Sequence, residues 1–141
     1  MPLRLTFDAS EVDWDEAAKL ISSTLAQREP APLRAAFEHS QVAVFAWDKT
    51  RLAGMGRALD DGVYQAALYD ICLLPEYQGH GHGRVLLQAL LDRINGATVL
   101  LFAVPGKEAF YERFGFQAMV TAMARFQDPE RMLRQGYLKP R

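Results

Sequence analysis

The sequence feature that most constrains the fold is a run of alternating glycines between residues 70 and 84, at Gly79, Gly81 and Gly83. Before them, an apolar run ends at Pro75, which cannot continue a strand ladder because proline has no amide hydrogen. After them, an amphipathic run begins at Arg84. A glycine loop between a strand and a helix places uncovered backbone amides at a helix N-terminus, where they bind anions. The segment therefore predicts a diphosphate site, to which Arg84 adds positive charge.

Two other phosphate-binding loops do not match these residues. A P-loop ends in Gly-Lys-Ser or Gly-Lys-Thr, and that ending is missing here. The dinucleotide fingerprint needs a later third glycine than Gly83 and a βαβ context. Taken alone, the loop is also compatible with a tight turn before a helix.

The hydrophobic periodicity predicts a mixed α/β domain. Alternating or continuous apolar runs indicate strands over residues 3–7, 41–47, 51–59, 64–74, 98–104 and 116–126. Helical spacing, with Asp13 as a cap and Pro32 in a first turn, indicates helices over residues 13–27, 32–39, 84–94 and 107–114. The predicted order is βααβββαβαβ, with a central mixed and largely antiparallel sheet. A short helix closed by Gly136 follows it.

Length and composition limit the class of protein. The 141 residues fit one domain, which we expect to comprise a core over residues 3–126 and a C-terminal extension over residues 127–141. The net charge of −1 and the interrupted basic residues near the C-terminus argue against a nucleic-acid partner. A single cysteine rules out a disulfide framework. No apolar run approaches the length of a membrane span or forms a signal core, so we expect no membrane partner and a cytoplasmic location.

Two motifs resemble those of the GNAT superfamily of N-acetyltransferases. Gln78-x-x-Gly81-x-Gly83 resembles the superfamily's Q/R-x-x-G-x-G/A motif. The preceding residues also match the superfamily, with a strand reading Asp70-Ile71-Cys72-Leu73 and then Pro75-Glu76-Tyr77. Downstream, the segment from Phe110 to Phe116 resembles the motif F-Y-x-x-x-G-F. A helix and a strand are predicted between the two motifs, and the order of elements over residues 3–126 fits the superfamily as well.

The resemblance implies that acetyl-CoA is the co-substrate. In the superfamily the loop amides hold its diphosphate, and the residues at those positions here are Gly79, His80, Gly81, His82, Gly83 and Arg84. The backbone of the preceding strand, here Ile71, Cys72 and Leu73, pairs with the pantetheine arm like an added strand. One of those amides polarises the thioester carbonyl. The sequence departs from many relatives at Val104, where they carry a cofactor-contacting asparagine.

Tyr111 and Asp70 are the candidate catalytic residues. In the family, the tyrosine at the position of Tyr111 contacts the cofactor and gives a proton or a hydrogen bond to the departing thiolate. The amine must lose a proton before it attacks, and Asp70, one residue before Ile71, is the candidate base. Asp70 alternatively binds the cationic substrate or caps a turn. From spacing alone, Tyr111 is equally compatible with a core aromatic residue.

Other chemistry-bearing residues have simpler interpretations. His80-x-His82 lacks a third ligand nearby, so we expect no metal site. His39 is expected to cap a helix, with a substrate role as the alternative. A cysteine in mid-strand, Cys72, is typical of a core residue and not of an acyl-carrying nucleophile.

The prediction is an acetyl-CoA-dependent N-acetyltransferase that acts on a small primary amine through direct attack in a ternary complex. The alternatives are transfer to a protein N-terminus or lysine, and a non-catalytic acyl-CoA-binding regulatory domain. The apolar last strand (Met119, Val120, Ala122, Met123, Phe126) predicts a homodimer, because an exposed sheet edge needs cover.

Overall fold

The computed structural model describes residues 2–141. The chain divides into two compact units, the first ending at Leu101 and the second spanning Phe102–Arg141.

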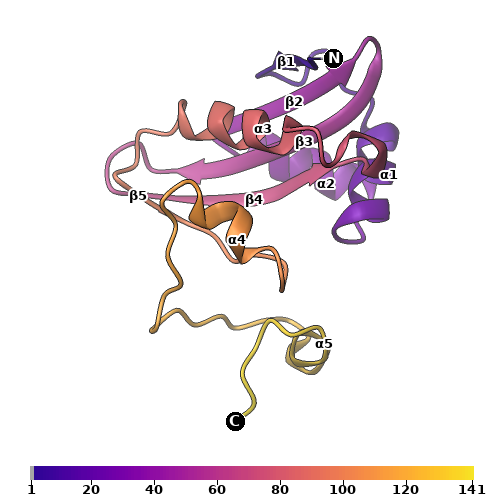
Figure 1. Cartoon of the computed structure of the whole chain (residues 1–141). Helices are drawn as coiled ribbons and strands as arrows, with labels where there is room; N and C mark the ends of the chain where they lie inside the picture. Colours follow the sequence, from indigo (N-terminus) through magenta and orange to yellow (C-terminus); the bar gives the residue numbers. More distant parts are fainter. Residues whose placement is uncertain (1) are drawn as a thin grey trace. The chain divides into compact units, whose positions relative to one another are not determined.

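The first unit is built on a five-stranded sheet (Figure 1). Its elements in chain order are β1 (Arg4–Thr6), α1 (Trp14–Thr24), α2 (Pro30–Glu38), β2 (Val42–Asp48), β3 (Arg51–Asp60), β4 (Gln65–Leu73), the 3₁₀ turn η1 (Pro75–Tyr77), α3 (His82–Leu91) and β5 (Thr98–Leu100). The strands lie in the order β1-β2-β3-β4-β5. All neighbours are antiparallel except β4 and β5, which are parallel. The predicted fold class, a mixed and largely antiparallel sheet with helices, is confirmed.

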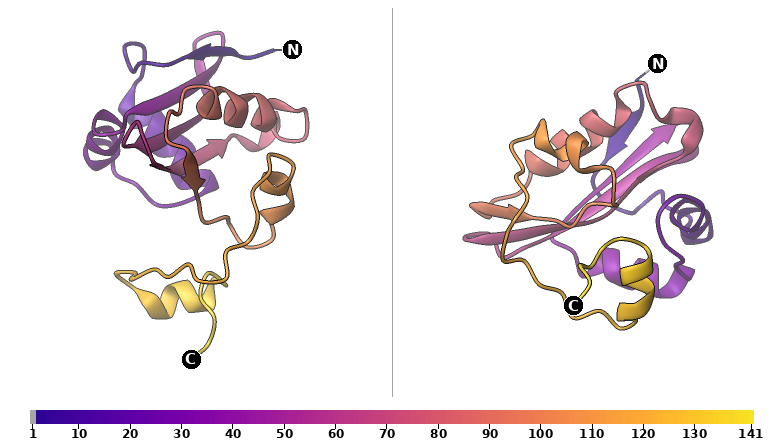
Figure 2. Two further views of the ribbon diagram at one scale, coloured as in Figure 1. Left: turned by 90° about the vertical axis from the view of Figure 1, so that its left-hand side faces the viewer. Right: turned by 60° about the horizontal axis from the view of Figure 1, so that its bottom comes forward.

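Helices cover both faces of this sheet. In the right-hand view of Figure 2, α3 lies above the sheet, and α1 and α2 lie below it. The core on the side of α1 and α2 contains Ile21, Leu33, Phe37, Phe45 and Cys72. On the other side, α3 buries Leu86, Leu87 and Leu90.

The predicted helix ends rest on local hydrogen bonds. The Asp13 carboxylate accepts from the amides of Asp15 and Glu16 at the start of α1, which satisfies donors that the helix leaves unpaired. His39 caps α2 as expected, with its ring Nδ1 2.7 Å from the carbonyl oxygen of Ala35. These caps fix the start of α1 and the end of α2, and the connection between the two helices carries Arg28, which pairs with Asp70.

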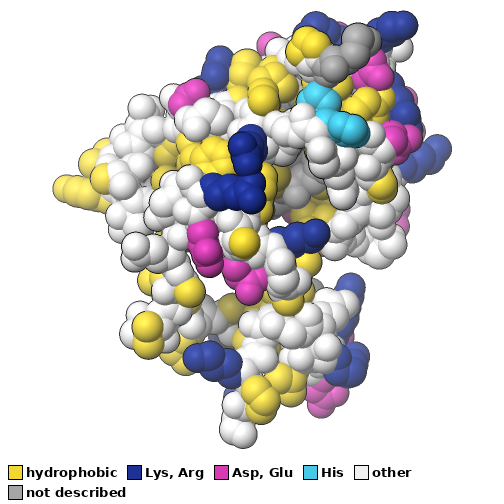
Figure 3. All heavy atoms as spheres, viewed as in Figure 1, with side chains coloured by type: hydrophobic (Ala, Val, Ile, Leu, Met, Phe, Trp, Pro, Cys, Tyr) yellow, Lys and Arg dark blue, Asp and Glu magenta, His cyan; other side chains and the backbone are white. Residues whose placement is uncertain are grey.

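The second unit contains two short helices, α4 (Glu108–Glu112) and α5 (Pro129–Arg134). Phe102 packs against Phe126 and Tyr137 with ring centroids 5.8 Å apart in both pairs. The apolar side chains of Val120 and Met123 are 92% and 97% exposed, and apolar groups lie open on this unit in Figure 3.

Two sequence predictions about strands are wrong. Residues 116–126 form no strand, so the order of elements ends in two helices. The predicted strand over residues 98–104 is confined to Thr98–Leu100. Apolar alternation shows only that a segment suits a half-buried pleated surface. A strand also needs a partner for its backbone, and the partner depends on distant parts of the chain.

Candidate active site

A bulge in β4 is the first element of the site. Met55 pairs with Cys72 and Arg57 pairs with Tyr69, so Gly56 alone faces two residues, Asp70 and Ile71. Asp70 adopts the left-handed conformation, with φ +57°, which is uncommon for a residue other than glycine. Such a bulge turns the strand and re-aims its side chains.

Gly56 is closely packed where it faces the bulge. A Cβ atom at this position would lie 2.9 Å from Leu90 Cδ1 of α3 and 3.1 Å from Ile71 Cγ1. Both atoms belong to side chains, so a larger residue at position 56 would require the side chains of Leu90 and Ile71 to shift. The bulge is therefore built by long-range packing as well as by the conformation of Asp70.

Beyond the bulge, β4 presents backbone groups on its outer edge. The ladder between β4 and β5 covers Gln65–Ala67 and Thr98–Leu100, so Ile71, Cys72 and Leu73 lie past its end. The amide of Leu74 donates to the carbonyl oxygen of Ala53 on β3 at 2.8 Å. Since successive residues of a strand direct their backbone groups to opposite edges, those of Leu73 point away from β3. An extended amide-containing chain fits such an edge.

The glycine loop follows directly. Gly79 and Gly81 have φ values of +81° and +86°, and a Cβ atom on either would meet no other group within 4 Å. Their missing side chains therefore leave open space on a backbone that only glycine adopts without strain. The first hydrogen bond inside α3 runs from Val85 N to Gly81 O at 3.3 Å. The amides of His82, Gly83 and Arg84 precede it, so the helix does not use them.

Side chains connect the loop to the sheet. Gln78 Nε2 donates to the carbonyl oxygen of Leu73 at 2.9 Å. The Tyr77 hydroxyl donates to Asp48 Oδ2 at 2.6 Å, and this bond raises the pKa of Tyr77. The sequence motif includes Gln78, but nothing in the sequence indicated its bond to Leu73 or the Tyr77–Asp48 bond, because both join residues from different elements.

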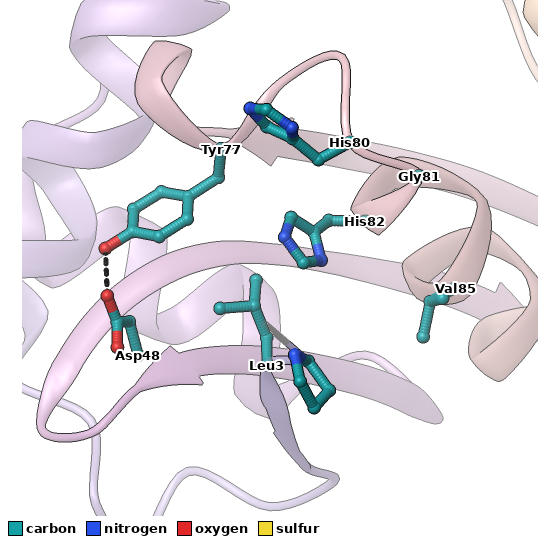
Figure 4. A pocket seen from close by; sticks show the side chains of 8 residues that line it. Leu3, Asp48, Tyr77, His80, Gly81, His82 and Val85 are labelled. Carbon is teal, nitrogen blue, oxygen red and sulfur yellow. Dashed lines mark hydrogen bonds between the residues drawn. The ribbon is translucent and has the colours of Figure 1, made fainter.

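A pocket of about 470 Å³ lies beside the loop (Figure 4). Its lining consists of Pro2, Leu3, Asp48, Tyr77, His80, Gly81, His82 and Val85. His80 and His82 have ring centroids 6.3 Å apart, and Figure 3 shows histidine side chains on the molecular surface. The pocket includes neither Asp70 nor Ile71–Leu73. It therefore adjoins the predicted diphosphate loop, and the bulge lies outside it.

Two predicted site residues are buried in β4. The Asp70 carboxylate forms ion pairs with Arg57 and Arg28. Cys72 lies in the core beside α1, where burial raises the pKa of its thiol to about 12. Almost none of this thiol is ionised at neutral pH, and only the thiolate is a good nucleophile.

Tyr111 lies on α4, in the second unit. Its ring packs edge-on against Phe110 and Phe116, with centroids 5.1 and 6.0 Å away. Burial raises the pKa of its hydroxyl, so Tyr111 stays protonated at neutral pH. The Tyr111 hydroxyl can therefore donate a hydrogen bond, and its ring is held by aromatic residues of the Phe110–Phe116 motif.

The comparison with protein families decides the classification. Residues 10–126 match the model of the acetyltransferase (GNAT) domain. The chain belongs to the GNAT family. Members of this family use acetyl-CoA as co-substrate. The match includes the β4 bulge, the glycine loop and the Tyr111 motif.

Curated relatives and solved structures agree with this assignment. The GNAT chain is 33% identical over 91 residues to ycf52 of Porphyra purpurea, an uncharacterized N-acetyltransferase, and the match covers 60% of the chain and 52% of the relative. It is also 33% identical over 97 residues to the chloroplastic serotonin N-acetyltransferase 2 of Oryza sativa, with coverages of 64% and 48%. The chain therefore spans about half the length of these relatives.

A similar fold occurs in a probable acetyltransferase from meticillin-resistant Staphylococcus aureus. The TM-score is 0.78 at 21% identity, with 88% of this chain and 97% of that chain covered. At this level of identity the similarity concerns the fold.

Across residues 2–141, no cluster of three or more His, Cys, Asp or Glu side chains is arranged to hold a metal ion. Within the same range, no helix is both long enough and apolar enough to cross a membrane.

Proposed function

We propose that this GNAT chain is an N-acetyltransferase that moves an acetyl group from acetyl-CoA to a primary amine of a small molecule. The observation that carries the proposal is the path from the outer edge of β4 into the glycine loop. Along it, backbone groups of Leu73 point away from β3, and Gly79 and Gly81 leave open space at the start of α3. An elongated ligand with amide groups and a diphosphate fits this sequence of donors and acceptors.

Each part of the path has a role in holding acetyl-CoA, which supplies an acetyl group activated as a thioester. The amides from Gly79 to Arg84 bind its diphosphate, with favourable charge from the helix N-terminus. Ile71, Cys72 and Leu73 bind its pantetheine arm. An amide in this stretch donates to the thioester carbonyl, where negative charge develops during the reaction.

Transfer proceeds by direct attack of the amine, without an acyl-enzyme stage. The cysteine next to the proposed thioester site is Cys72, which is buried with a thiol pKa of about 12. A neutral, enclosed thiol is a poor nucleophile. The amine therefore attacks while both substrates are bound.

Tyr111 acts as the general acid, and Asp70 is the candidate base. The raised pKa of Tyr111 keeps its hydroxyl protonated, as a donor to the leaving thiolate requires. The alternative role of Asp70 is to bind the cationic amine. If Asp70 is the base, Asp70→Asn lowers kcat/KM most strongly at low pH. A pH profile with the shape of the wild-type profile leaves only the binding role.

The experiment that tests the function is thiol release from acetyl-CoA in the presence of small primary amines and, separately, of peptides. The name of the Oryza sativa relative, a serotonin N-acetyltransferase, supports a small amine. Thiol release with amines and not with peptides is the expected result. Release with peptides alone would replace this acceptor with a protein, and no release despite acetyl-CoA binding would reject the proposal.

We also propose a homodimer and a cytoplasmic location. The dimer is supported by the exposed side chains of Val120 and Met123, since a second copy of the chain would remove them from water. Sedimentation at micromolar concentration should show a species of twice the chain's 15.8 kDa. A monomer alone would contradict the dimer.

A further inference from the structure

Asp70 is a buried carboxylate at a strained position of the backbone. Its side chain is 6% exposed, and its φ of +57° places it at the β4 bulge. A buried charge is costly unless a partner compensates it. Strained residues at such sites persist where the surrounding structure holds them.

One oxygen of Asp70 is firmly held. Oδ2 lies 2.7 Å from Arg57 Nε. The Arg57 side chain is only 14% exposed; its Nη1 donates to Ser40 Oγ at 3.2 Å, and its guanidinium lies 5.2 Å from the centre of the Tyr69 ring. These contacts fix Arg57, and Arg57 fixes the carboxylate.

The other oxygen has a looser partner. Oδ1 lies 3.7 Å from Arg28 Nη2, which is longer than a hydrogen bond between charged groups. Arg28 is in the connection between α1 and α2, and its side chain is 44% exposed. Its Nη1 donates to the carbonyl oxygen of Gln27 at 3.2 Å. A half-exposed ion pair of this kind contributes little stability.

We propose that Asp70 Oδ1 binds the ammonium group of the acceptor, and that Arg28 competes with the acceptor for this oxygen. The proposal rests on the proposed function and narrows its substrate class to primary alkylamines that are protonated at neutral pH. An alkylammonium group is compact and has three donors, so it approaches a carboxylate oxygen more closely than Arg28 does here. Asp70 directly precedes Ile71, so the bound amine lies beside the strand proposed to hold the thioester.

If Arg28 competes with the acceptor, replacing Arg28 should strengthen the binding of the amine. Arg28→Gln removes the competing charge and keeps a polar side chain, so the KM for an alkylamine falls by roughly two- to five-fold, the range for losing a weak ion pair. kcat stays within about two-fold of wild type. Arg34→Gln is the matched control, because Arg34 is an exposed arginine paired with Glu38 on α2. Its KM should not change.

A double-mutant cycle isolates the pairing. Asp70→Asn removes the charge but tolerates the left-handed conformation, and it should raise the amine KM by about ten-fold or more, as losing a partner for a charged group does. In the Asp70→Asn background, Arg28→Gln should no longer lower KM. If Asp70→Asn does not fold, the sign of the Arg28→Gln effect still decides the proposal.

Two outcomes would overturn it. An unchanged KM in Arg28→Gln means that Arg28 does not compete, and a raised KM means that Arg28 binds an anionic group of the acceptor. Calorimetric titration of an alkylamine into wild type and Arg28→Gln gives the same comparison as dissociation constants. Binding that tightens in Arg28→Gln without thiol release would uphold this site while rejecting the acetyl transfer.

Discussion

The side-chain amide of Gln78 donates to the carbonyl oxygen of Leu73 at 2.9 Å. This bond joins the start of the glycine loop to the outer edge of β4, the two segments proposed to hold acetyl-CoA. Because α3 begins directly after the loop, the bond also sets where the helix amides lie relative to the strand.

Removing this bond should loosen the loop. We expect Gln78→Ala to raise the KM for acetyl-CoA by roughly three- to ten-fold, the equivalent of one hydrogen bond, with little change in melting temperature. Gln88→Ala is the control, since Gln88 forms an exposed bond of the same kind to Asp92 on α3. Equal acetyl-CoA kinetics in Gln78→Ala and wild type would show that the bond does not position the loop.

Gly81→Val should weaken acetyl-CoA binding by about ten-fold or more, or roughly 1.4 kcal/mol. Valine would fill the open space beside the loop amides and would strain a backbone with φ +86°. Gly62→Val separates these effects, because Gly62 has φ +81° and open surroundings in the β3–β4 turn. Calorimetry should show weakened acetyl-CoA binding in Gly81→Val and wild-type binding in Gly62→Val. The same affinity in both variants would remove the loop from the site.

Tyr111→Phe tests the proposed general acid. The substitution keeps the ring that packs against Phe110 and Phe116 and removes only the hydroxyl. We expect kcat to fall by about 10²–10⁴-fold, as for other general acids, with unchanged acetyl-CoA affinity. Because burial raises the pKa of Tyr111, its ionisation should not reduce the wild-type rate until well above neutral pH.

Tyr64→Phe serves as the control for Tyr111→Phe, since Tyr64 is an exposed tyrosine in the β3–β4 turn. It should leave kcat unchanged. Turnover of Tyr111→Phe within about two-fold of wild type, with chemistry shown to be rate-limiting, would exclude the general-acid role.

Asp60 should make the stability of the fold depend on pH. Its carboxylate accepts from the amides of Asn95, Gly62 and Gly96 at 2.8, 2.9 and 3.0 Å, and these bonds lower its pKa. A lowered folded-state pKa means that the stabilisation is present at neutral pH. It is lost as the pH falls below about 4, through the folded-state pKa.

Urea unfolding of wild type and Asp60→Asn measures this effect. The variant should be less stable at neutral pH, and the difference should shrink as the pH falls below about 4. Asp92→Asn, which removes an exposed carboxylate at the end of α3, should show no comparable pH dependence. A constant difference between wild type and Asp60→Asn across this range would contradict the assignment.

Local sequence patterns determined most elements of the first unit and the place of the loop. The alternating glycines, Pro75 and the amphipathic run after them act over a few residues, so the strand, loop and helix around residues 70–84 could be predicted from the sequence. The cap at Asp13 and the C-terminal cap at His39 are similarly local. The resemblance of two short motifs then identified the family, which the match over residues 10–126 confirmed.

Only the tertiary structure decided the surroundings of Asp70. Arg28, Arg57 and Asp70 come from three separate segments, and their ion pairs exist because the fold brings the α1–α2 connection beside the bulged sheet. The absence of a strand over residues 116–126 has the same cause. The conformational preference of a short segment depends on each residue and its near neighbours in the sequence. A strand partner or a buried ion pair depends on contacts between distant residues, which only the folded chain makes.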